Sequence, residues 1–242
     1  IAMPTDQQDR RFSNQLLHTW SAPLCVIGIV TGLVFIAGFI PPPPAYLSAD
    51  QVAALYQGST TQIRVGLFLA MAFTSLLAPF SAVIAVQMMR TEGNRPVLAL
   101  TQLVNGAIGS LVLLIAFMIM MAAAFDPARP AEITKAIHDL GWLMLLLPFP
   151  PFCIQYIAIG LQILQDKSAQ PLFPRWVAFF NFWIAISFIP TGLVGFFKVG
   201  PMTWHGLIGF WIPTISYATW FMVMFFALRP AIRRDEKELQ SG

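Results

Sequence analysis

Long apolar runs alternate with short polar segments along the whole chain. Six of the runs are long enough to cross a hydrocarbon core of about 30 Å, which takes roughly 20 residues of helix. They cover approximately residues 22–40, 65–89, 97–124, 140–164, 176–197 and 207–228. A transmembrane β-barrel would show short segments of alternating polarity instead. The pattern therefore predicts an all-α fold, a polytopic transmembrane helix bundle with six spans.

Two segments between the apolar runs predict short helices at the membrane interface. Ser48 and Gln51 form a capping-box pattern that opens a helix over Ala49–Tyr56. In the segment 125–138, a proline precedes a second helical pattern, AEITKAIH. The chain thus divides into an N-terminal cytoplasmic segment 1–21, a six-helix transmembrane domain 22–228 and a cytoplasmic tail 229–242 that begins as a helix.

Prolines interrupt four of the six predicted spans, and a proline inside a helix leaves a backbone carbonyl without its donor. The fourth span contains LLLPFPPFCIQYIAIGLQIL, with three prolines followed by two glutamines. Irregular backbone at membrane depth normally faces the protein interior or a cavity. We therefore expect the fourth span to form the broken, polar centre of the bundle.

The second and fourth spans resemble each other. Pro79–Phe80 is followed by IAVQMM, and Pro151–Phe152 by IAIGLQIL. Gln87 and Gln162 each lie nine residues before a further proline. Either the chain contains a parallel repeat of two-helix hairpins, or the similarity is a coincidence in apolar sequence. A true repeat would favour a site between the two hairpins.

Composition and charge agree with the membrane class. Of the 242 residues, 57% are hydrophobic and only 10% are charged, with a mean hydropathy of +0.70, outside the usual range of soluble domains. The basic residues of the short loops are divided unequally between the two sides, and an excess of such residues marks the cytoplasmic side. The side that carries both termini has Arg10, Arg11, Arg90, Arg95, Lys167, Arg175, Arg229, Arg233, Arg234 and Lys237, and the other has Arg64, Arg129, Lys135 and Lys198.

These counts predict that both termini are cytoplasmic. Residues 1–20 show no cleavage-site pattern before the first apolar run, so we expect no removable signal peptide. Tryptophans near span ends are expected to anchor the bundle at the interface: Trp20, Trp142, Trp176 and Trp204.

Ionisable side chains are missing from the middle of the spans. Intramembrane charges mark ion paths and proton relays, so their absence argues against an ion-coupled transporter or a proton pump. Cys25 and Cys153 both lie in apolar spans and are expected to be reduced core residues, not a disulfide or a metal pair.

His138, Asp139 and His205 all fall at the predicted outer face. They are the candidate catalytic residues, and two interpretations remain open. They converge as a small metal, haem or acid–base site, or they are ordinary interfacial polar residues. The chain has no HxxxH, HExxH or CxxC spacing, so no metal site is predicted, and the sequence identifies no cofactor.

Polar and aromatic residues inside the spans are the candidate ligand-binding residues. Gln155 and Gln162 are seven residues apart and share one helix face. These groups either line a cavity for an amphipathic ligand, or bond across helices and cover carbonyls that proline frees. The candidates are Gln102, Asn105, Gln155, Tyr156, Gln162, Asn181, Trp183 and Tyr217.

Three stretches, FIPPPPAYLSADQVAALY, QPLFPRW and KVGPMTWHGLIGFWIP, resemble a family of bacterial polytopic inner-membrane proteins. The family has no known activity, so the resemblance implies a location in the bacterial inner membrane and nothing about mechanism.

These observations favour an integral membrane subunit or accessory protein that binds or passes a hydrophobic small molecule, such as a lipid, sterol, quinone or pigment. Its expected partners are membrane lipids and either other membrane subunits or a second copy of the chain, with no nucleic acid. The alternatives are a membrane enzyme acting on a lipid or isoprenoid, and an ion-independent facilitator.

Overall fold

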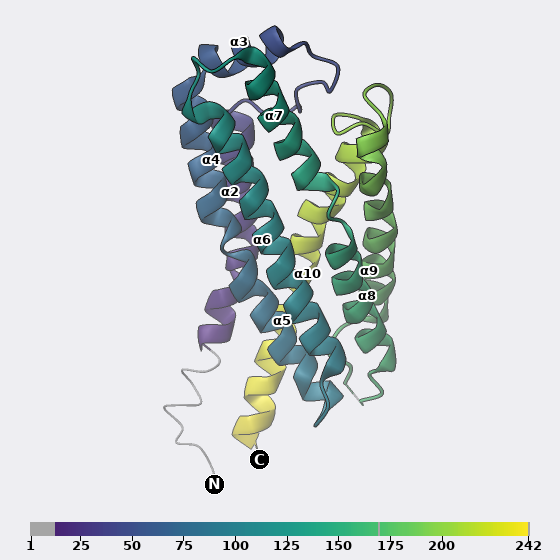
Figure 1. The fold of residues 1–242 in the computed structure, drawn as a ribbon. Coiled ribbons are helices and arrows are strands. Elements are labelled where there is room, and N and C mark those ends of the chain that lie inside the picture. Colours follow the sequence, from purple (N-terminus) through teal and green to yellow (C-terminus); the bar gives the residue numbers. More distant parts are fainter. Residues whose placement is uncertain (1–12, 169, 242) are drawn as a thin grey trace.

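The computed structural model describes residues 13–168 and 170–241, and every regular element in this part of the chain is a helix. Six segments are long and apolar enough to cross a membrane, and they stand side by side in one bundle (Figure 1). They are Ser13–Ile36, Thr60–Glu92, Val97–Phe125, Ala131–Gln165, Arg175–Phe196 and Leu207–Lys237. The predicted all-α bundle with six spans is confirmed.

Most spans are built from more than one helical piece. The first joins α2 (Ser21–Val30) to the π-helix η1 (Thr31–Ile36), and the fifth joins α9 (Arg175–Phe188) to the 3₁₀-helix η2 (Ile189–Phe196). The sixth starts as the π-helix η3 (Leu207–Trp211) and continues as α10 (Ile212–Ser241). The third is the single helix α6 (Val97–Phe125).

The second and fourth spans are divided in a similar way. The second consists of α4 (Thr60–Thr74) and α5 (Leu77–Glu92), and the fourth of α7 (Ala131–Leu146) and α8 (Pro150–Gln165). The Pro-Phe pair of each span lies in the first turn after its break. The two matched segments therefore share a backbone feature as well as residues, while a common origin stays a prediction.

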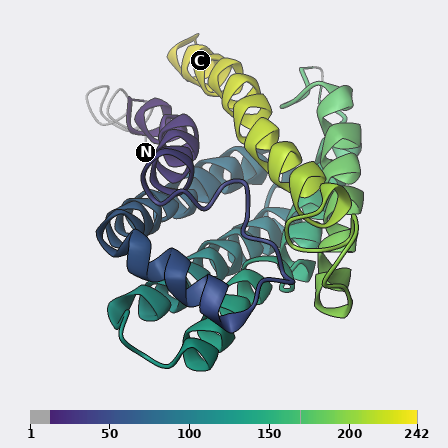
Figure 2. The ribbon, with the colours of Figure 1, turned by 90° about the horizontal axis from the view of Figure 1, so that it is seen from above.

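Both ends of the described chain lie toward the same end of the bundle. The first described helix begins and α10 finishes at the same end, which we call the terminal end (Figure 1). Seen along the bundle, α10 lies between the first span and α9 (Figure 2). α10 continues through Pro230, so the described part of the predicted tail is helical. Residues 1–12 lie outside the described part, and the expectation of no signal peptide stays a prediction.

The opposite end carries the short helix α3 (Ala49–Gly58). Its predicted capping box is present, because the Ser48 hydroxyl accepts from the Gln51 N–H at 3.3 Å and the Gln51 side chain accepts from the Ser48 N–H at 2.9 Å. The second predicted short helix is not separate from the bundle. Residues 131–138 form the first turns of α7, which runs on to Leu146 because no proline interrupts it before Pro148.

Glycines allow the first two spans to approach each other. A Cβ atom on Gly66 would lie 2.3 Å from the carbonyl oxygen of Gly32, and one on Gly32 would lie 2.4 Å from that of Gly66. Real Cβ atoms do not approach backbone so closely, so only glycine permits this contact. Such small-residue contacts are a main source of helix association in membranes.

Substituting Gly66→Ala should therefore destabilise the bundle by about 1–3 kcal/mol, because both backbones must shift. Unfolding of the purified protein in mixed detergent micelles measures this change. Gly58→Ala is the matched control, since a Cβ there meets nothing within 4 Å. Equal stability of the two variants would show that the glycine contact is not needed.

Candidate ligand cavity and buried polar groups

An apolar cavity of 340 Å³ lies inside the bundle. Aliphatic and aromatic side chains from every span except the second line it, among them Leu33, Phe117, Phe152, Phe188 and Tyr217. Its few polar side-chain groups belong to Thr191, Thr214, Tyr217 and the indole of Trp211. The lining is suited to a hydrocarbon or aromatic body with few polar groups.

The lining of the cavity reaches the outer surface of the bundle at the first span and at α10. Val30 and Ile215 both line it, and their side chains are 39% and 59% exposed. In a membrane-embedded bundle, these side chains face hydrocarbon. A hydrophobic molecule can therefore reach the cavity from the bilayer without crossing water.

Broken helices surround this cavity. Pro148 and Pro150 have no N–H, so the carbonyls of Met144 and Leu146 lack the donor that a continuous helix would supply. Leu146 itself lines the cavity, as does Pro213 at the start of α10. The expectation that proline-broken backbone at membrane depth borders a cavity is thus met in the fourth and sixth spans.

Of the eight candidate ligand-binding residues, Tyr217 lines the cavity. Gln102 and Gln155 instead join α5, α6 and α8. Gln102 donates to the Ser81 carbonyl at 2.7 Å, and Gln155 donates to the Gln102 side-chain oxygen at 3.2 Å and to the Ser81 hydroxyl at 3.3 Å. A Cβ on Gly106 would lie 2.1 Å from the Ser81 hydroxyl, so this cluster also requires a glycine on α6.

The other candidates also serve contacts between or within helices. Asn181 accepts from the Trp220 indole at 2.9 Å, and Gln162 donates to the Thr91 hydroxyl. Asn105 donates to the Thr101 carbonyl of its own helix at 2.8 Å. Interhelical bonds of this kind contribute about 0.6–2 kcal/mol each.

Two aromatic candidates lie away from the cavity lining. Tyr156 is buried between Phe188 and Trp220, and its hydroxyl has no partner among the described residues. Trp183 is 52% exposed and stacks on Phe180. Trp183 therefore belongs to the outer surface of the bundle.

His138 is buried, with 1% of its surface exposed. Its Nδ1 lies 3.0 Å from the Tyr56 hydroxyl, and Phe39, Trp142 and Trp204 pack around its ring. Its Nε2 is buried without a partner among the described residues. His138 lies on the buried face of α7, together with Thr134, Gly141 and Trp142.

Burial also corrects the expected anchoring role of two tryptophans. Trp142 and Trp204 are 1% and 5% exposed, and the Trp204 indole donates to the Pro43 carbonyl at 2.9 Å. Trp204 thus holds the proline segment 41–44 against the bundle. Trp20 and Trp176 are about half exposed near the terminal end, as anchors require.

The three catalytic candidates are not joined by any hydrogen bond that the structure shows among them. Asp139 forms an ion pair with Lys135 at 2.9 Å on α7. His205 accepts from the Ala45 N–H through Nδ1 at 3.1 Å. Among the described residues, no group of three or more histidine, cysteine or acidic side chains is placed to hold a metal ion.

Sequence reasoning missed Phe188 and Phe210 as cavity residues. The available signal was their position beside Pro190 and Pro213, or on the π-helix that precedes α10. The glutamines and the asparagines among the candidates serve contacts between or within helices instead.

The six long apolar helices of the described chain are those of a multi-pass membrane protein. Comparison of the chain with protein-family models, with curated proteins and with solved structures finds no match.

We expect His205 to make the stability of the fold depend on pH. Partial burial lowers the pKa of its imidazole below the ordinary value, so the folded protein binds this proton less readily than the unfolded chain does. The contribution of neutral His205 to the stability of the fold is therefore fully present above about pH 6.5 and is lost as the pH falls. Protonation of Nδ1 also removes the acceptor of the Ala45 N–H.

We expect the thermal stability of the purified protein to fall between about pH 8 and about pH 5, and His205→Gln to reduce this fall. His18→Gln, at an exposed histidine, is the control. Equal pH profiles of the wild type and His205→Gln would contradict the assignment.

Proposed function

We propose that this protein is an integral membrane subunit or accessory protein that binds a hydrophobic small molecule in the cavity between the first span and α10. The observation that carries the proposal is the apolar cavity of 340 Å³ with exposed rim residues on both of these spans. Its volume falls within the range of about 300–1,000 Å³ that small-molecule sites occupy.

The lining restricts the chemistry of the ligand. Apart from its two threonines, Tyr217 and the Trp211 indole, the side chains of the cavity offer no polar groups suited to a charged ligand. Thr191 already donates to the Phe188 carbonyl at 2.7 Å. A hydrocarbon chain or flat ring system with one hydroxyl or carbonyl fits best, as in a lipid tail, a sterol, a quinone or a pigment.

The proposed location is the bacterial inner membrane, with the terminal end in the cytoplasm. The excess of basic residues at that end supports this orientation. The partners that we propose are membrane lipids together with other membrane subunits or a second copy of the chain.

Filling the cavity tests the binding proposal. Ala218→Phe places an aromatic ring at a lining position, whereas Thr219→Phe adds the same ring at the neighbouring exposed position, which does not line the cavity. We expect organic extracts of the purified wild type and Thr219→Phe to contain a retained hydrophobic molecule at near-stoichiometric amounts. Ala218→Phe should retain at least about tenfold less, a loss of about 1.4 kcal/mol.

Mass spectrometry of the extracts measures this difference. Both variants must first elute as folded protein in size-exclusion chromatography. Equal retention by the two variants, or no retained molecule in the wild type, would refute the proposal.

Orientation is tested separately with single cysteines in a background that lacks Cys25 and Cys153. In intact cells with a permeabilised outer membrane, a membrane-impermeant maleimide should label Gly58→Cys on α3 and leave Asn94→Cys unlabelled. Asn94 lies in the exposed loop between α5 and α6 at the terminal end. The reverse pattern would place the termini outside.

A further inference from the structure

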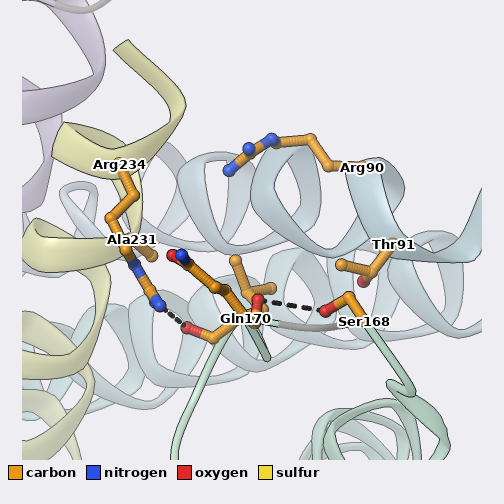
Figure 3. A pocket seen from close by; sticks show the side chains of 7 residues that line it. Arg90, Thr91, Ser168, Gln170, Ala231 and Arg234 are labelled. Carbon is orange, nitrogen blue, oxygen red and sulfur yellow. Dashed lines mark hydrogen bonds between the residues drawn. The ribbon is translucent and has the colours of Figure 1, made fainter. Parts of the chain in front are cut away.

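A second pocket, of 450 Å³, lies at the terminal end between α5, α10 and the loop that joins α8 to α9. Polar side chains dominate its lining: Arg90 and Thr91 of α5, Ser168 and Gln170 of the loop, and Arg234 of α10. Figure 3 shows the two arginines approaching from different helices, with Gln170 between them. Two guanidinium groups thus converge on one hollow.

Hydrogen bonds and an ion pair hold both arginines in place. Arg90 donates to the Gln87 side chain at 2.9 Å and pairs with Asp235 at 3.1 Å, which ties α5 to α10. Arg234 donates to the carbonyls of Pro171 and Leu172 at 3.2 and 3.0 Å. A fixed guanidinium loses less conformational entropy when it binds a ligand.

The hydrogen bonds of Arg234 go to neutral carbonyl groups, and the attraction of the nearby Asp166 carboxylate balances its charge in part. The nearby carboxylate of Asp166 binds the backbone of its own loop, accepting from the Leu172 N–H at 2.7 Å and the Ser168 N–H at 3.0 Å. Burial raises the pKa of Asp166, but these bonds and Arg234 outweigh it and hold the pKa below its ordinary value. Asp166 therefore acts as a structural anion of the loop.

The Gln170 side chain is exposed in the pocket and adds amide donors beside the guanidinium groups. Planar guanidinium forks match the oxygens of a phosphate, and bonds between charged partners are about twice as strong as neutral ones. Basic pockets between transmembrane helices at a cytoplasmic surface are suited to anionic lipid headgroups.

We propose that this pocket binds an anionic phosphate group, with Arg90 and Arg234 as its charge partners and Gln170 as a further donor. The group belongs either to the headgroup of an anionic phospholipid or to a small soluble phosphate compound.

This site is distinct from the apolar cavity. On α10, Ala218 lines the cavity and Ala231 lines the pocket, a separation of 13 residues or about 20 Å of helix. Between them, the side chains of Trp220, Met224 and Leu228 are buried in the core. Phosphate binding can therefore be tested independently of the hydrophobic ligand.

The test uses the purified full-length chain and two pairs of variants. Arg234→Gln removes one charge from the pocket, and Arg233→Gln removes the same charge from an exposed neighbour that does not line it. Gln170→Glu adds a negative charge to the pocket without removing the hydrogen bonds of Arg234, and Gln165→Glu adds the same charge at an exposed position outside it. The second pair keeps the test valid if Arg234→Gln fails to fold.

Native mass spectrometry with dioleoyl phosphatidylglycerol, compared with dioleoyl phosphatidylcholine, measures lipid binding. Competition by inorganic phosphate distinguishes the two sources. We expect Arg234→Gln and Gln170→Glu to weaken binding of the anionic probe about tenfold, which corresponds to about 1.4 kcal/mol. The two control variants should change it less than about twofold, since exposed charges act weakly.

If the two pocket variants lose phosphatidylglycerol binding and inorganic phosphate does not compete with the lipid, the ligand is a lipid headgroup. Effective competition, together with thermal stabilisation by phosphate alone, supports a soluble phosphate compound. If pocket and control variants weaken binding equally, or if phosphatidylglycerol binds no better than phosphatidylcholine and phosphate has no effect, the proposal is overturned. Ala218→Phe should leave phosphate-dependent binding unchanged, which separates this result from that of the cavity.

Discussion

Every backbone N–H and C=O inside a hydrocarbon layer must find a partner within the protein, and the arrangement of this bundle follows from that constraint. In four spans, prolines lack the N–H donor of a regular helix, so these helices cannot satisfy the constraint by themselves. The fourth span is the clearest case, because α7 stops at Leu146 and α8 starts at Pro150. Leu145 and Leu146 before this break and Phe152 after it line the cavity, so the break lies beside the cavity. The constraint therefore favours a position of the proline breaks in the interior of the bundle, next to the cavity.

Polar side chains in the spans mainly join helices to one another. The cluster of Ser81, Gln102 and Gln155 connects three helices, and Asn181 connects α9 to Trp220 of α10. Because these groups satisfy each other, they leave the ligand cavity largely apolar. The amide side chains are thus used for helix packing, and the lining of the cavity stays largely aliphatic and aromatic.

The two ends of the bundle have different chemistry. At the opposite end, aromatic rings surround His138, and Trp204 fastens the proline segment through the Pro43 carbonyl. At the terminal end, Gln15, Gln87, Arg90 and Asp235 form a chain of hydrogen bonds and an ion pair. The apolar cavity within the bundle and the basic pocket at the terminal end thus differ in the chemical groups that line them.

The sequence by itself determined the class, the six spans, the α3 cap and the prolines that break the helices, because these depend on local composition and backbone chemistry. Only the tertiary structure decided that residues 131–138 join α7, that His138 and Trp142 are buried, and that Phe188, Thr191 and Thr214 meet in one cavity. Likewise, Arg90 and Arg234 lie far apart in the chain but line one pocket. The reason is physical: hydropathy records which residues avoid water, whereas which of them touch depends on helix rotation and on the packing of all six spans.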